Sequence, residues 1–200
     1  MKNSLLIFGF FILGIVLGIY HWLPDILING DWSTYVLYAL LFLIGITIGG
    51  DKNALILLKQ MNYKIFLVPL GVILGTLGGA WILSLVYKGL TSQEILAVSA
   101  GFGWYSLSSI FISKLHSETL GVVALMSNVF REIFTLLATP LLVKYFGKLA
   151  GITSGGATSM DTTLPIITKY SGKEFALISI FSGIVLTVIV PFLVTLILEF

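Results

Sequence analysis

Three charged residues lie inside long apolar stretches of the sequence. Arg131 and Glu132 fall midway along the stretch 119–143, and Asp161 lies within a polar run inside the stretch 149–168. A charge at the centre of a membrane-spanning helix costs about 2.5–3.5 kcal/mol on insertion scales, so it needs a partner, a water-filled cavity or a change of protonation. A carboxylate in such a place binds either a cation or a proton. We therefore take these three residues as candidates for solute and proton binding.

The run Ser154-Gly-Gly-Ala-Thr-Ser-Met-Asp-Thr-Thr-Leu-Pro165 predicts an interrupted helix around Asp161. Gly155 and Gly156 disfavour a continuous helix, and Pro165 lacks a backbone donor and disfavours helix just before it. Broken helices supply the binding sites of many secondary transporters, where protein or a cavity surrounds the freed backbone. The alternative is a polar loop at the membrane interface. Hydroxyl groups that can hydrogen-bond the freed backbone belong to Thr158, Ser159, Thr162 and Thr163.

A polar stripe accompanies the charged pair on the stretch 119–143. Asn128, Glu132 and Thr135 recur at i, i+4 and i+7, with Arg131 at i+3, so all four share one helical face. The stripe either lines a solute path or anchors this helix to a neighbour through an ion pair. In the first case we expect Arg131 to face a substrate carboxylate or to hold Glu132.

The run Gly101-Phe-Gly-Trp-Tyr-Ser-Leu-Ser-Ser109 places two aromatic rings beside two glycines within the stretch 94–112. Trp104 and Tyr105 lie too deep for an interfacial belt, and Ser106 shares a helical face with Gly103. Two glycines beside two rings can bend the helix and expose an aromatic face. Such a face attracts an ammonium group by about 0.5–2 kcal/mol. The alternative is a pair of ordinary core aromatic residues.

The remaining ionisable residues predict no metal site and no enzymatic centre. His21 and His116 fall at expected interfaces, and neither has a second ligand at metal-binding spacing. The absence of cysteine excludes thiolate metal sites and a cysteine nucleophile. Asp51 follows Ile48-Gly49-Gly50, which lacks the Gly-x-Gly-Asp pattern of intramembrane aspartyl proteases. We expect no cofactor and no enzymatic activity.

The composition indicates that a lipid bilayer surrounds the elements that position these residues. Hydrophobic residues make up 58% of the 200 positions and charged residues 10%, whereas soluble domains are about 25% charged. The net charge of +2 is small and its basic residues are dispersed, which argues against nucleic-acid binding. The apolar runs are continuous rather than alternating, so they predict helices instead of barrel strands.

Seven apolar segments approach the roughly 20 residues that a spanning helix needs. Short connectors predict a single transmembrane transporter domain over residues 1–200. We expect an all-α polytopic bundle with one or more segments interrupted or re-entrant around Asp161. Glycines four apart, as at Gly71, Gly75 and Gly79, predict close helix packing. The expected segments are 4–23, 33–50, 65–87, 94–112, 119–143, 149–168 and 175–198.

Loop charges predict the orientation of this multi-pass protein in the cytoplasmic membrane. An inside N-terminus places outside only Lys88, Lys144 and Lys148. It places inside the lysines Lys2, Lys52, Lys59, Lys64, Lys114, Lys169 and Lys173. The C-terminus then lies outside if the sixth segment crosses, and inside if that segment is re-entrant.

The three motifs, in this order, resemble the lysine exporter LysO family. They are Ala100-Gly-Phe-Gly-Trp-Tyr-Ser-Leu-Ser108, the cluster from Asn128 to Glu132, and Gly155-Gly-Ala-Thr-Ser-Met-Asp-Thr-Thr-Leu-Pro165. The resemblance covers about residues 5–198, and it is to the C-terminal portion of longer members. It implies export of L-lysine in exchange for protons, with a membrane carboxylate that we assign to Asp161. It also implies a second copy of the chain or a small membrane subunit as partner.

Proton exchange agrees with the chemistry of these residues. A carboxylate that binds a cation or a proton, but not both, is sufficient for antiport. We expect Asp161 to be the coupling carboxylate and Glu132 a second acidic site, with Trp104 and Tyr105 as walls. Alternatives are a passive channel, an accessory subunit, or a transporter of another amino acid or organic cation. The candidate substrate- and proton-binding residues are Asp161, Glu132, Arg131, Asn128, Trp104, Tyr105, Ser106, Thr158, Ser159 and Thr162.

Overall fold

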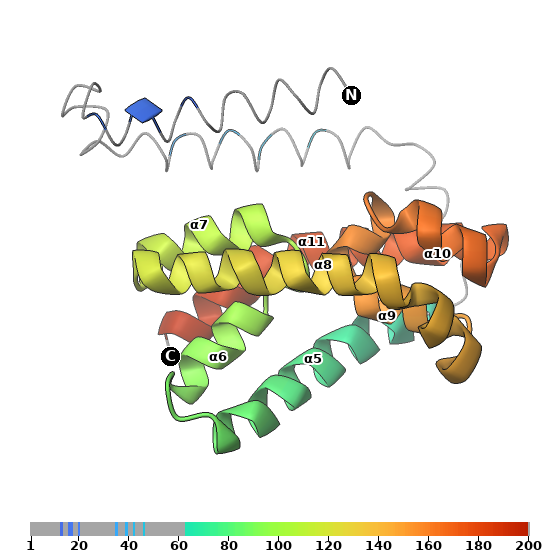
Figure 1. Cartoon of the computed structure of the whole chain (residues 1–200), viewed down its shortest axis with the longest axis horizontal. Helices are drawn as coiled ribbons and strands as arrows, with labels where there is room; N and C mark the ends of the chain where they lie inside the picture. Colours follow the sequence, from blue (N-terminus) through green and yellow to red (C-terminus); the bar gives the residue numbers. More distant parts are fainter. Residues whose placement is uncertain are drawn as a thin grey trace. The chain divides into compact units, whose positions relative to one another are not determined.

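The computed structural model describes residues 63–199 and a few isolated positions between residues 13 and 46. The expected segments 4–23 and 33–50, together with His21 and Asp51, lie outside the described residues. The chain divides into two compact units, 1–46 and 47–200. The second unit carries the labelled helices of Figure 1. Its described regular elements are all helical, as the sequence predicts.

Three helices in the described part of the chain are long and apolar enough to cross a membrane. They are α5 (Leu67–Val86), α8 (Glu118–Phe146) and α11 (Ala176–Glu199). Short 3₁₀ turns precede two of them, η1 (Tyr63–Phe66) before α5 and η3 (Lys173–Phe175) before α11. Each long helix agrees with an expected segment to within a few residues, because each has the apolar length that spans about 30 Å of hydrocarbon.

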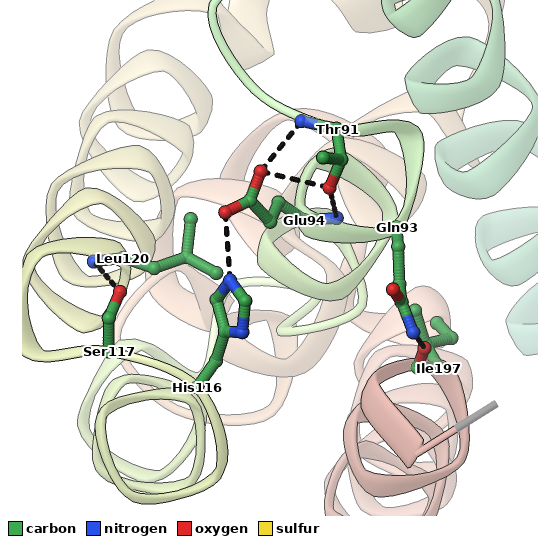
Figure 2. A network of polar contacts seen from close by, with 7 residues as sticks. All are labelled: Thr91, Gln93, Glu94, His116, Ser117, Leu120 and Ile197. Carbon is green, nitrogen blue, oxygen red and sulfur yellow. Dashed lines mark hydrogen bonds and ion pairs between the residues drawn. The ribbon is translucent and has the colours of Figure 1, made fainter.

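The fourth expected segment, 94–112, turns back instead of crossing. Helix α6 (Ser92–Ser99) leads to a break at residues 100–104, and α7 (Tyr105–Leu115) returns from it. The two outer ends meet, since Nε2 of His116 lies 2.8 Å from Oε1 of Glu94 (Figure 2). At 1.5 Å per residue each half-helix is about 12–17 Å long, roughly half of a hydrocarbon core. Residues 92–115 therefore form a re-entrant pair, which we call the first hairpin.

The sixth expected segment is also a hairpin, and its interruption lies where the sequence predicts it. Helix α9 (Ala150–Gly155), η2 (Gly156–Met160) and α10 (Leu164–Ser171) follow one another around Asp161. The Oγ of Ser171 donates to the carbonyl of Lys148 at 2.7 Å, so the two ends of this segment also lie together. We call residues 150–171 the second hairpin.

The two hairpins open toward opposite ends of the unit (Figure 1). Helix α8 connects the mouth of the first hairpin to that of the second over 29 residues. Gln93, at the first mouth, donates to the carbonyl of Ile197 near the end of α11 at 2.7 Å (Figure 2). Helix α11 begins beside the second mouth, where Lys148 lies 3.4 Å from Glu174. We call these the first end and the second end of the unit.

The unit contains one pattern twice, in opposite orientations. Helix α5 runs to the first end and the first hairpin follows it, whereas α8 runs to the second end and the second hairpin follows it. Helix α11 closes the arrangement and packs closely on η2. A Cβ at Gly183 of α11 would lie 2.5 Å from the Cβ of Met160. Inverted repeats of this kind place a binding site midway across the membrane in many secondary transporters.

Candidate functional site at the hairpin tips

Backbone contacts join the tips of the two hairpins. The amide nitrogen of Ala157 donates to the carbonyl oxygen of Phe102 at 2.8 Å. A Cβ at Gly156 would collide with that carbonyl, and one at Gly103 would lie 2.9 Å from the carbonyl of Gly155. Both glycines also have positive φ, +62° and +99°, a backbone conformation that residues with a side chain rarely adopt. The tips therefore touch only because glycine occupies both positions.

Asn128 of α8 holds the first tip. Its Oδ1 accepts a hydrogen bond from the amide of Gly103 at 2.7 Å, and its Nδ2 donates to the carbonyl of Ala124 at 2.9 Å and to that of Val98 at 3.4 Å. The side chain is buried. Protein groups thus occupy its amide oxygen and both amide hydrogens. In this state Asn128 positions the tip.

Arg131, nearly one turn further along α8, holds the second hairpin. Its Nε donates to the carbonyl of Ser154 at 2.9 Å and its Nη2 to that of Thr153 at 3.1 Å. Its Nη1 reaches Oγ1 of Thr76 on α5 at 3.3 Å. The last carbonyls of a helix lack intrahelical donors and carry the negative end of its dipole, so a guanidinium is well suited to them.

Three members of the polar stripe, Asn128, Arg131 and Thr135, thus contact the hairpins from one face of α8. Arg131 binds backbone carbonyls of the second hairpin rather than Glu132. Within residues 63–199 no ion pair joins Arg131 and Glu132. Thr135 extends the contact, with its Oγ1 2.7 Å from Oγ of Ser154.

Tyr105 has long-range electrostatic interactions with Glu132 and Asp161, which lie on two other elements. Tyr105 begins α7, Glu132 lies on α8, and Asp161 directly follows η2. The hydroxyl of Tyr105 lies within electrostatic range of both carboxylates. Among the described residues, neither acid forms an ion pair with a basic side chain.

Asp161 lies exposed at the break, and its Oδ1 accepts from the amide and hydroxyl of Thr162 at 2.5 and 3.3 Å. Ser106 is also exposed, and Trp104 is half-buried. Helix α7 begins here with Trp104 as its N-cap, and no side chain caps its first amides. Asp161 is thus exposed in the same region as a helix N-terminus that no side chain caps.

Two of the four hydroxyl groups expected to bind freed backbone at the second tip do so, whereas Thr162 donates to Asp161 and the hydroxyl of Thr163 lies 3.4 Å from that of Thr158. Thr158 donates to the carbonyl of Gly155 at 2.9 Å, and Ser159 to that of Gly156 at 2.6 Å. Ser159 and Ser179 of α11 also exchange hydrogen bonds with each other's carbonyls, at 3.1 and 2.7 Å. Both tip hydroxyls are buried. They stabilise the break and fix it to α11.

Sequence reasoning missed Thr76, which contacts Arg131, and also Phe102 and Ser179, which contact the second hairpin. Thr76 is one of two hydroxyl residues in an otherwise apolar α5, which was an available signal. Phe102 adopts φ +46° and is fully buried at the first tip. Nothing in its residue type indicates that its carbonyl binds the second hairpin.

Comparison with known proteins matches this chain to one family. A family model described as "Lysine exporter LysO" matches residues 8–198. A "Putative lysine exporter" of Haemophilus influenzae is 35% identical over 191 residues, which cover 91% of each chain. The "Lysine exporter LysO" of Escherichia coli (strain K12) is 32% identical over 164 residues, 81% of this chain and 53% of that protein. The chain thus aligns with about half of the E. coli protein. No solved structure matches the chain.

Proposed function

The chain belongs to the lysine exporter LysO family, and on this premise we propose that it exports L-lysine across the cytoplasmic membrane in exchange for protons. The observation that supports this most is the joining of two opposed hairpins at their tips, with Asp161 and Glu132 both within long-range electrostatic reach of Tyr105. Broken helices that meet inside an inverted repeat are a common binding-site architecture in secondary transporters.

The exposed side of the tips complements a dibasic amino acid. Asp161 and Glu132 provide one carboxylate for each of two ammonium groups, and neither has a basic partner among the described residues. The half-buried rings of Trp104 and Tyr105, at the start of α7, can attract cations through their faces. The uncapped first turn of α7 suits the substrate carboxylate, because helix N-terminal amides bind anions.

Coupling follows from competition for the same carboxylates. A proton bound to Asp161 removes the charge that an ammonium group needs, and a bound ammonium group disfavours the proton. A proton taken up from outside is then released inside as lysine binds. Asn128 and Arg131 act as positioning residues that hold one hairpin each on α8. Alternating access arises when the joined tips separate and one hairpin or the other moves.

The two hairpins change which lysines lie on the same side of the membrane. Because the fourth and sixth segments both turn back, Lys114 joins Lys88 at the first end, while Lys144 and Lys148 join Lys169 and Lys173 at the second. Cytoplasmic loops carry the excess of lysine and arginine, so we assign the second end to the cytoplasm. Helix α11 then ends outside. Four of these six lysines lie inside and two outside, whereas the sequence alone predicted three on each side.

The direct test reconstitutes the purified chain in liposomes preloaded with labelled lysine. We expect efflux to accelerate when the outside is made acidic and to slow when a protonophore collapses the pH gradient. External arginine, alanine and choline then report which solutes compete. Efflux that ignores the pH gradient indicates a channel. Efflux that appears only with a co-purified small membrane protein indicates an accessory subunit.

A further inference from the structure

The mouth of the second hairpin carries a concentration of positive charge. Four exposed lysines surround it, at the end of α8, just before α9, in α10 and just after α10. We call these residues, Lys144, Lys148, Lys169 and Lys173, the lysine collar. Glu174 is the one acidic residue at this end among the described residues, and its side chain is 66% exposed.

Aromatic rings accompany the collar. The Nζ of Lys144 lies 5.3 Å from the ring centroid of Tyr145, and that of Lys169 lies 5.3 Å from that of Tyr170. The Nζ of Lys148 lies 5.4 Å from the ring of Phe175. Tyr145 and the adjacent Phe146 are 69% and 78% exposed. Exposed rings at helix ends lie at headgroup depth in a membrane, where lysine stems extend from the apolar layer toward the phosphates.

The first end has the opposite balance of charge. Two lysines, Lys88 and Lys114, are accompanied there by Glu94, Glu118 and Glu199 among the described residues. An anionic surface is therefore complementary to the second end alone. A soluble acidic protein fits this end poorly, because Tyr145 and Phe146 place large apolar area directly beside the lysines. A lipid leaflet satisfies both the charges and the rings.

We propose that the lysine collar binds the headgroups of anionic phospholipids in the leaflet that it faces. Each lysine near an anionic membrane surface strengthens binding about fivefold. Three of the four collar residues lie at the two ends of the second hairpin, so bound lipid links the end of α10 to the start of α9. This inference is independent of the transported solute and of proton coupling.

Native mass spectrometry of the full chain in an uncharged detergent tests the proposal. We expect phosphatidylglycerol to bind more tightly than phosphatidylcholine, and 0.5 M salt to weaken that preference. Lys148→Gln should weaken phosphatidylglycerol binding about fivefold. The four-lysine variant, in which glutamine replaces all four collar lysines, should lose the preference for phosphatidylglycerol over phosphatidylcholine. The control is Lys88→Gln with Lys114→Gln at the first end, which should leave it intact.

Three outcomes overturn the proposal: equal binding of the two lipids by the wild type, a preference that survives in the four-lysine variant, or an equal loss in the control. Should the four-lysine variant fail to fold by gel filtration, the four single variants decide instead. Competition by millimolar inorganic phosphate would show a site for free phosphate and would contradict a lipid surface.

Discussion

The amide nitrogen of Ala157 lies 2.8 Å from the carbonyl oxygen of Phe102, and this bond joins two re-entrant hairpins that enter the unit from opposite ends. Asn128 and Arg131, three residues apart on α8, each hold one of these hairpins. In the transport cycle that we propose, breaking the contact on one side opens a path from the tips to one end of the unit, and the acidic residues then face each side of the membrane in turn.

Gly156→Ala should separate the tips and reduce transport at least tenfold, because its Cβ would collide with the carbonyl of Phe102. Lysine flux in proteoliposomes measures the effect. Gly71→Ala is the matched control, since in the described part of the chain a Cβ there meets nothing within 4 Å, in contrast to the close packing that the glycine spacing predicts, and alanine favours helix by about 1 kcal/mol. Equal flux in Gly156→Ala and wild type would show that the joined tips are dispensable.

The hairpin topology can be tested by labelling single cysteines, because the natural chain contains none. Cysteines replacing Lys88 and Glu118 should react with an impermeant maleimide from the same side of oriented vesicles. Cysteines replacing Lys148 and Lys173 should react from the other side. If Lys88→Cys and Glu118→Cys label from opposite sides, the segment between them crosses the membrane and the first hairpin is wrong.

Arg131→Gln should lower the unfolding free energy by about 2–4 kcal/mol, because two partly buried carbonyls lose charge-assisted donors. Arg131→Lys should rescue little, since one ammonium group cannot reproduce the fork of the guanidinium. Thermal unfolding in detergent measures both. Lys144→Gln, an exposed change on the same helix, should stay within about 0.5 kcal/mol of wild type. Full rescue by Arg131→Lys would contradict the proposed positioning role.

Glu94→Gln at the mouth of the first hairpin should destabilise the protein in a pH-dependent way. The backbone amide of Thr91 and then the bond to His116 hold the pKa of Glu94 below its usual 4.5. Such a carboxylate stabilises the fold fully above the unfolded pKa and loses that contribution as pH falls through the folded pKa. The difference in Tm between wild type and variant should be full at pH 6–7 and shrink below about pH 4.5. A constant difference would contradict this.

The sequence predicted α5, α8 and α11 because a spanning helix is recognised by apolar length alone. It also predicted the break around Asp161, since Gly155, Gly156 and Pro165 disfavour helix locally. These features depend on local sequence, so a single sequence is enough to predict them.

The reversal of residues 94–112 could not be predicted in the same way. Its length is suitable for a crossing, and the turn depends on distant partners. Glu94 meets His116 across 22 residues, and Gly103 meets Asn128 across 25. The partner of Arg131 escaped prediction for the same reason, because carbonyl acceptors such as that of Ser154, 23 residues away, have no side-chain signature.

The most direct test of the account is lysine efflux from proteoliposomes of Asp161→Asn under an acidic-outside pH gradient. We predict that gradient-driven efflux falls at least tenfold, because asparagine can neither take up the proton nor carry the charge that binds the ammonium group. Glu199→Gln, an exposed change at the end of α11, should transport like wild type. Export by Asp161→Asn at the wild-type rate would contradict the role of Asp161 as the coupling carboxylate.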